Sequence, residues 1–179
     1  MREACDHPRD ALLIDLFWHT GARVSELVGA RGPRKADLTA TGLRLRNLKR
    51  GEGAEKHVLL HPVFLGELQQ LMHAYPLTRP LVGRLDDGDR PIGRGMAWRI
   101  VSRAATKASV FKAHRVGDAL RPAWCHTLRH GNAVHLLLNG VAITGVQRQL
   151  GHANLGNTQR YTQIADEDLA RQIGRVPYP

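Results

Sequence analysis

The chain has 179 residues, of which 26 are Lys or Arg and 16 are Asp or Glu, so its formal net charge is +10 at pH 7. Hydrophobic residues make up 42% of the sequence, an ordinary share for a globular protein with one substantial core. The sequence contains no apolar run as long as a membrane span, and the charges of Arg2, Glu3 and Asp6 argue against a signal peptide at the start.

The first part of the chain is predicted to form helices around one small hairpin. A helix is expected from Pro8 to Thr20, because proline suits a first helical turn, leucines follow at helical spacing and a glycine comes next. A short second helix is expected from Arg23 to Val28. Alternating residues from Leu43 to Leu48 and an apolar run from His57 to Leu60, separated by a glycine-containing turn, predict an antiparallel hairpin.

The remainder is predicted to be helical apart from two irregular stretches. Residues 75–93 are rich in Pro, Gly and Asp and are expected to form a loop, and residues 113–122 are expected to be a connector. Helical segments are expected at Pro62–Ala74, Met96–Lys107, His126–Leu138, Ala142–Leu150, Asn157–Tyr161 and Asp166–Ile173. Together the elements predict a single domain over residues 1–179, mainly α with a small antiparallel β-sheet (α+β).

Basic residues concentrate in two segments, residues 31–56 and 94–121, where acids are few. A positive surface attracts polyanions, most often nucleic acid, although a generally basic proteome would give the same composition. Aromatic residues make up only 5% of the chain, which disfavours single-strand binding by stacking and favours duplex DNA. The candidate phosphate contacts are Arg44, Arg46, Arg50, Lys56, Arg99, Arg103 and Lys107.

The sequence offers little support for metal or redox chemistry. Cys5 and Cys125 lie far apart and match no metal or redox motif, which predicts reduced thiols and a cytoplasmic location. His126 and His130 have the i,i+4 spacing of a two-His metal site, but no Glu lies between them and no third ligand is evident. We therefore expect neither a metal nor a cofactor.

Two segments in the first part of the chain suggest groups that act on a phosphate. In the segment TGARVSEL, Arg23 follows a glycine turn at a helix N-terminus, where its guanidinium and the free N–H groups suit a phosphate, and Glu26 could orient it. Alone, this pattern would favour a surface i,i+3 ion pair. In the predicted hairpin, Lys49 or Lys56 could donate a proton to a leaving oxygen, although turn lysines are usually solvated.

Two later segments supply further candidates. His126 and Arg129 are one helical turn apart, so a proton carrier and a fixed positive charge can face one phosphate together. His152 precedes Tyr161 by nine residues. Tyrosine has an ordinary pKa of about 10, so it attacks phosphorus readily only where nearby cations stabilise its phenolate. A lone tyrosine near a short helix is usually a core or surface residue.

Taken in order, these residues resemble the tyrosine recombinase (phage integrase) family. The family pattern is Arg, then Lys in a hairpin turn, then His-x-x-Arg, then His or Trp, then Tyr. The stretches that carry the resemblance are TGARVSEL, HTLRH and LGHANLGNTQRYTQI, and it extends from about Pro8 to Ala165. The matching residues are Arg23, Lys49, His126, Arg129, His152 and Tyr161.

The resemblance implies the fold of that family's catalytic domain and a role for each matching residue. Arg23 and Arg129 would hold the scissile phosphate of duplex DNA, with Glu26 supporting them from behind. Tyr161 would attack phosphorus to leave a 3′-phosphotyrosyl link and a free 5′-hydroxyl. Lys49 would protonate the departing 5′ oxygen. His126 would exchange a proton with the tyrosine, and His152 would form a hydrogen bond with the phosphate.

Two departures from the family pattern leave alternatives open. The N-terminal helical domain that usually completes a clamp on DNA is expected to be absent, so the chain is either a fragment of a longer protein or a short protein without that clamp. The turn at residues 49–53 differs from the usual Gly-Lys-Gly, so Lys56 remains a rival for Lys49. Residues 166–179 form an expected C-terminal helix and tail that could be exchanged between protomers assembled on DNA, up to a tetramer. The alternative functions are a non-cleaving DNA-binding accessory or truncated relic, and a DNA-relaxing topoisomerase of type IB chemistry.

Overall fold

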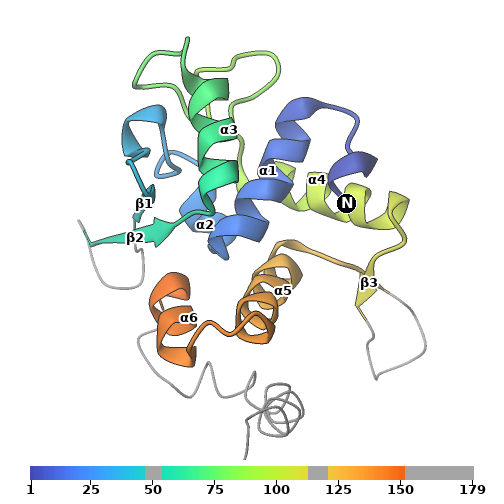
Figure 1. Ribbon diagram of the computed structural model, residues 1–179. Helices are drawn as coiled ribbons and strands as arrows, with labels where there is room; N and C mark the ends of the chain where they lie inside the picture. The colour runs from blue at the N-terminus through green and yellow to red at the C-terminus, as the bar shows by residue number, and fades with distance from the viewer. Residues whose placement is uncertain (47–53, 113–120, 152–179) are drawn as a thin grey trace, which may run out of the picture.

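The structure, a computed structural model, describes residues 1–46, 54–112 and 121–151, and this part of the chain is mainly helical (Figure 1). The α-helices are α1 (Pro8–Thr20), α2 (Val24–Leu27), α3 (Pro62–Met72), α4 (Arg94–Lys107), α5 (Cys125–Leu138) and α6 (Ile143–Leu150). The strands are β1 (Gly42–Arg46), β2 (Glu55–Leu59), β3 (Phe111–Lys112) and β4 (Arg121–Pro122), and short 3-10 helices cover η1 (Arg2–Ala4) and η2 (Lys35–Asp37). The prediction of a mainly α domain with a small antiparallel sheet is confirmed.

Helix α1 is the centre of the fold, and its bounds are those that the sequence predicts. His7 caps its N-terminus by accepting a hydrogen bond from the backbone N–H of Arg9, and proline occupies the first turn. Gly21 ends the helix in the left-handed conformation, with φ of 57°. Buried side chains such as Leu13 and Phe17 face the core, and α1 packs against α4 and α5. This helix therefore fixes where α2 begins and where α5 lies.

Strands β1 and β2 form an antiparallel hairpin with one face toward the core. Leu43 lies opposite Val58, and Leu45 lies opposite Lys56. Leu43, Leu45 and Val58 are fully or almost fully buried. Because directly opposite residues share a face of the sheet, this register places Lys56 on the core side with the apolar residues. The strand begins at Glu55, two residues before the predicted start at His57.

Helices α5 and α6 pack beside each other. A small apolar cluster of Ala133, Val146 and Leu150 joins them, separate from the main core around α1, α3 and α4. Helix α6 lies alongside β2, as Figure 1 shows. The end of α6 is therefore held between the hairpin and α5.

Some predicted boundaries were wrong by a few residues. Helix α3 ends at Met72, helix α4 begins at Arg94 after the N-cap Gly93, and helix α5 begins at Cys125 because Thr127 accepts a hydrogen bond from the backbone of Trp124. The predicted connector is not wholly irregular, because Arg121–Pro122 pairs with Phe111–Lys112. The expected helices at 157–161 and 166–173 lie outside the described residues.

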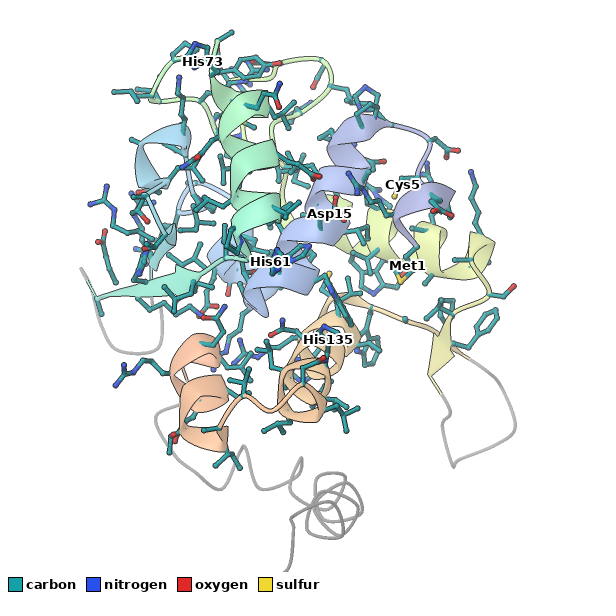
Figure 2. All side chains as sticks on the ribbon, viewed as in Figure 1. Met1, Cys5, Asp15, His61, His73 and His135 are labelled. Carbon is teal, nitrogen blue, oxygen red and sulfur yellow. The ribbon has the colours of Figure 1, made fainter. Side chains whose placement is uncertain are left out.

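Both cysteines are free. Cys5 lies beside Met1 near the N-terminus, as Figure 2 shows, and its thiol contacts the Met1 carbonyl. Within the described ranges, none of the helices has the length and apolar character needed to cross a membrane.

Candidate active site

Arg23 and Glu26 are joined at the start of helix α2. The backbone N–H of Arg23 donates to Oε2 of Glu26 over 2.8 Å, and Nη1 of Arg23 donates to Oε1 over 2.9 Å. The first bond caps the helix, because Glu26 reaches back to the residue that precedes the first turn. The Glu26 side chain is only 1% exposed, whereas that of Arg23 is 25% exposed. The carboxylate of this pair is buried and the guanidinium of Arg23 remains partly open to solvent. The pair is therefore not a simple surface ion pair.

Lys56 reaches the same carboxylate from strand β2. Its Nζ atom donates to Oε2 of Glu26 over 2.9 Å and to the backbone carbonyl of Leu150 over 3.2 Å. The side chain is 8% exposed. We expected Lys56 among the phosphate contacts of the surface, but the hairpin register turns its side chain into the interior. Sequence reasoning assigned neither of these two contacts.

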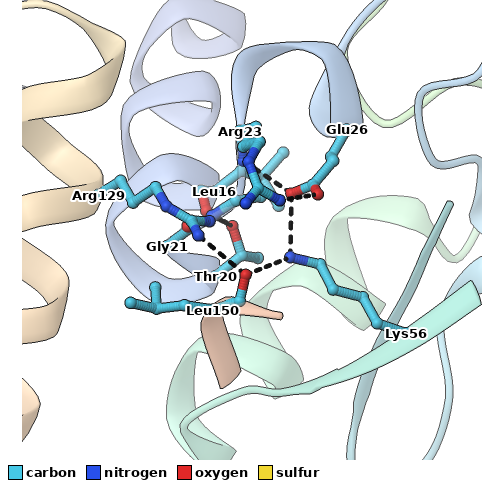
Figure 3. Close-up of polar contacts among 9 residues, drawn as sticks. Leu16, Thr20, Gly21, Arg23, Glu26, Lys56, Arg129 and Leu150 are labelled. Carbon is cyan, nitrogen blue, oxygen red and sulfur yellow. Dashed lines mark hydrogen bonds and ion pairs between the residues drawn. The ribbon is translucent and has the colours of Figure 1, made fainter. Parts of the chain in front are cut away.

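Arg129 lies on the inner face of α5 and is almost fully buried. Its Nη1 donates to the carbonyl of Gly21 over 2.6 Å, and its Nη2 donates to the carbonyl of Leu150 over 2.9 Å. The guanidinium thereby links the turn that precedes Arg23 to the end of α6, as Figure 3 shows. His126, one turn earlier on α5, is exposed, and its ring packs edge-on against that of His130 with centroids 4.3 Å apart.

Helix α6 is attached to β2 by a second contact. The side-chain amide of Gln149 donates to the carbonyl of Leu59 over 2.7 Å, and its oxygen accepts the backbone N–H of Leu59 over 3.1 Å. Gln149 therefore pairs with the strand as another peptide group would. The helix then ends at Gly151, which adopts the left-handed conformation with φ of 67° directly before His152.

The electrostatics of this cluster centre on Glu26. Burial alone would raise the pKa of its carboxyl, but the charge of Lys56 and the donors of Arg23 outweigh burial and hold the pKa below its ordinary value. Burial lowers the pKa of Lys56, and the attraction of Glu26 offsets this only in part. Glu26 is therefore ionised at neutral pH and is the counter-ion of both cations.

The structure brings Arg23, Glu26 and Arg129 together, and it adds Lys56 and the carbonyl of Leu150 to them. The candidate residues that lie outside the described part of the chain are Lys49, Arg50, His152 and Tyr161. In the described ranges, no group of three or more His, Cys, Asp or Glu side chains is placed to hold a metal ion.

The other candidate phosphate contacts lie on two separate elements. Arg44 is exposed on β1, where it donates to the carbonyl of Ala36, and Arg46 lies 3.9 Å from a carboxylate oxygen of Asp37. Arg99, Arg103 and Lys107 are exposed on α4. Both Lys107 and Arg103 face the carboxylate of Asp6, which Lys107 contacts directly. These basic side chains on α4 are thus partly neutralised by an acid from outside the helix.

A mainly helical domain with small antiparallel strand pairs, in which the arginine that caps α2 lies in one cluster with a buried arginine of α5, is the fold of a tyrosine recombinase catalytic domain. Residues 1–168 match the phage integrase family, and the chain belongs to that family.

Curated relatives of the chain are tyrosine recombinases. It is 30% identical to the tyrosine recombinase XerD of Corynebacterium glutamicum, over 96% of this chain and 53% of that protein. It is 32% identical to XerD of Bifidobacterium longum, over 90% of this chain and 51% of that protein. The chain therefore spans about half the length of these curated relatives.

Solved structures share its fold at lower identity. The XerA recombinase superposes with a TM-score of 0.71 at 22% identity, over 95% of this chain and 57% of that one. The catalytic domain of bacteriophage HP1 integrase superposes with a TM-score of 0.62 at 20% identity, over 98% of this chain and 89% of that one.

Proposed function

We propose that this chain is the catalytic domain of a site-specific recombinase, which cleaves and rejoins duplex DNA through a covalent link to Tyr161. The observation that carries the proposal is that Arg129 binds the Leu150 carbonyl at the end of α6, two residues before His152, while Arg23 is held by Glu26, which Lys56 links to the same carbonyl. Fixed positive charge at one point stabilises the charge that develops on a phosphate in the transition state.

The proposed reaction is a transesterification at phosphorus. The Tyr161 oxygen attacks the phosphorus, the bond from phosphorus to the 5′ oxygen breaks, and a 3′-phosphotyrosyl link remains. The tyrosine proton passes to His126, while His152 donates a hydrogen bond to the phosphate. Because one phosphoester replaces another, rejoining by the 5′-hydroxyl needs neither a nucleotide nor a metal.

We propose that Lys49 protonates the departing 5′ oxygen. The contacts of Lys56 with Glu26 and Leu150 support this choice, because a general acid must reach the leaving oxygen and Lys56 is bonded inside the domain.

The proposed partner is double-stranded DNA. Relatives of similar fold support it, since a XerH structure is described as bound to its difH substrate; XerH superposes with a TM-score of 0.62 at 24% identity, over 86% of this chain and 42% of that one. Arg44 and Arg99, exposed on two separate elements, are proposed to contact phosphates. Self-association on DNA would use residues 166–179, which lie outside the described residues.

The test traps the covalent intermediate. The protein at high concentration is mixed with a pool of nicked duplexes of randomised sequence, so that cleavage near the nick releases a short 5′-hydroxyl strand and prevents rejoining. A labelled covalent complex on a denaturing gel is expected for the wild-type protein and not for Tyr161→Phe.

Three other results would contradict parts of the proposal. An adduct that persists in Tyr161→Phe would exclude this tyrosine as the nucleophile. DNA binding without any adduct would favour an accessory role. Relaxation of supercoiled plasmid without exchange between defined sites would favour a topoisomerase.

A further inference from the structure

Lys56 carries its charge into the interior of the domain. It stands opposite Leu45 on the core side of the sheet, and 8% of its side chain is exposed. Placing an ammonium in the interior carries a large desolvation cost unless it is paired and fully hydrogen-bonded. The fold meets this cost with a carboxylate and a backbone carbonyl that come from two different elements.

The carbonyl that Lys56 binds is the last one of α6. Carbonyl groups in the final turn of a helix lack partners within the helix and carry its negative partial charge. The Leu150 carbonyl accepts hydrogen bonds from Lys56 and from Arg129, so two cations hold the same atom (Figure 3). The point at which the chain leaves α6 is thereby fixed from β2 and from α5 together.

Gln149 provides an independent attachment of the same helix to the same strand. Its side chain satisfies both the N–H and the C=O of Leu59. Lys56 and Leu59 are three residues apart on β2, and Leu150 directly follows Gln149 on α6. Two adjacent contacts therefore define both the position and the rotation of the end of α6.

We propose that Lys56 is a positioning residue, which together with Gln149 holds the end of α6 so that His152 and Tyr161 are delivered to the phosphate that Arg23 binds. Lys56 acts through Glu26, which orients Arg23, and through the Leu150 carbonyl, which precedes His152 by two residues. The proposal rests on the proposed function, and it assigns no contact between Lys56 and DNA.

The experiment separates positioning from proton donation by changing the leaving group. Single-turnover cleavage is measured with nicked duplexes whose bridging 5′ atom is oxygen or sulfur, because a thiolate leaves without being protonated. Lys49→Ala is expected to slow cleavage of the oxygen substrate and to recover with sulfur. Lys56→Met is expected to slow both substrates on the order of 100-fold, since a small misplacement of reacting groups costs about that much.

Matched variants control for folding and for charge. Lys56→Arg keeps a cation of similar reach and is expected to recover most of the rate. Gln149→Ala removes the second attachment at a half-buried side chain, and we expect an intermediate loss with both leaving groups. Gln147→Ala on the same helix is the control, because among the described residues it makes no bond to β2, and we expect wild-type rates.

A second readout does not require cleavage. Hydrogen exchange of the amides in residues 148–151, at the end of α6, is expected to be faster in Lys56→Met and Gln149→Ala than in the wild type and Gln147→Ala. Wild-type cleavage rates in Lys56→Met and Gln149→Ala, or recovery of Lys56→Met with sulfur, would overturn the proposal. A wild-type protein that cleaves no duplex, yet shows these exchange differences, would reject the proposed function while supporting the attachment itself.

Discussion

The Nζ atom of Lys56 lies 2.9 Å from Oε2 of Glu26, and both side chains are buried between α2, β2 and the end of α6. Within the described part of the chain, Glu26 accepts three hydrogen bonds, two from Arg23 and one from Lys56. One carboxylate therefore caps a helix, orients the exposed arginine and neutralises the buried lysine. The stability of the fold should therefore depend on the negative charge of Glu26.

Glu26→Gln is expected to destabilise the domain by about 3–5 kcal/mol, because it keeps the shape of the side chain but leaves Lys56 as a buried charge without its counter-ion. Urea unfolding at pH 7 measures the loss. The double variant Glu26→Gln with Lys56→Met is expected to recover part of it, since both charges are then gone. Asp86→Asn, which removes an exposed ion pair with Arg84, is the control. If Glu26→Gln lowered the unfolding free energy as little as Asp86→Asn does, the prediction would be contradicted.

The contribution of Glu26 should disappear in acid. Its folded pKa lies below the ordinary value of 4.5, so the folded state binds its proton less readily than the unfolded state does. The stabilisation is present above about pH 4.5 and is lost as pH falls through the folded pKa. We therefore expect the difference in unfolding free energy between wild type and Glu26→Gln to shrink steadily below pH 4.5. A difference that stays constant from pH 7 to pH 3 would show that the carboxylate charge is not responsible.

Gly21 allows the turn between α1 and α2 to approach α5 and α6. A Cβ atom there would lie 2.5 Å from Oδ1 of Asn132 and 2.6 Å from a methyl carbon of Leu150, at a backbone φ of 57°. Gly21→Ala is therefore expected to cost at least about 2 kcal/mol, through left-handed strain and displacement of the neighbours.

The matched control for Gly21 is Gly66→Ala on α3, where nothing lies within 4 Å of the added Cβ. We expect that variant to gain about 0.5–1 kcal/mol, because alanine favours the helix. Thermal or urea unfolding compares the two. Equal effects at both positions would mean that the close approach at Gly21 is not tight.

Sequence reasoning succeeded where the determinants are local. The bounds of α1 follow from Pro8 and Gly21, and Arg23 and Glu26 meet because residues three apart share a helix face. The orientation of Lys56 could also have been anticipated, because it lies two residues before the buried Val58 and alternation places both on one face.

Other contacts have no local signal. Gln149 and Leu59 are 90 residues apart in sequence, and their pairing depends on how α6 docks against β2. The carbonyl of Leu150 is a backbone group that every residue possesses, so no residue type marks it as the shared acceptor of Lys56 and Arg129. Such contacts become predictable only after the tertiary packing is known.

His19, at the end of α1, is expected to make the domain less stable in mild acid. Its ring stacks on Phe64 with centroids 4.1 Å apart. Burial lowers its pKa below the ordinary 6.5, and the charge of His61 lowers it further. Arg2 and His135 add to this lowering, whereas Glu67 raises the pKa. Figure 2 labels His61 and His135.

Because the folded pKa of His19 is lowered, the unfolded state takes up its proton first as the pH falls. Stability should decline from about pH 6.5 down to the folded pKa and level off below it. His19→Gln is expected to flatten this part of the curve of unfolding free energy against pH. His73→Gln at an exposed position tests whether losing any histidine has the same effect, and identical changes in the two variants would refute the assignment.

Asp6 is expected to weaken DNA binding by occupying the basic side chains of α4. Its carboxylate contacts Lys107 and lies 4.0 Å from Arg103, and the bond to Lys107 holds the pKa of Asp6 below its ordinary value. Asp6→Asn should therefore release positive charge toward the proposed phosphate contacts, tightening binding and steepening the dependence of log K on log salt. Fluorescence anisotropy with a labelled duplex at several salt concentrations measures both quantities. Asp89→Asn makes the same change in net charge beside Arg79, away from α4, and an equal gain in affinity there would show that net charge alone accounts for the effect.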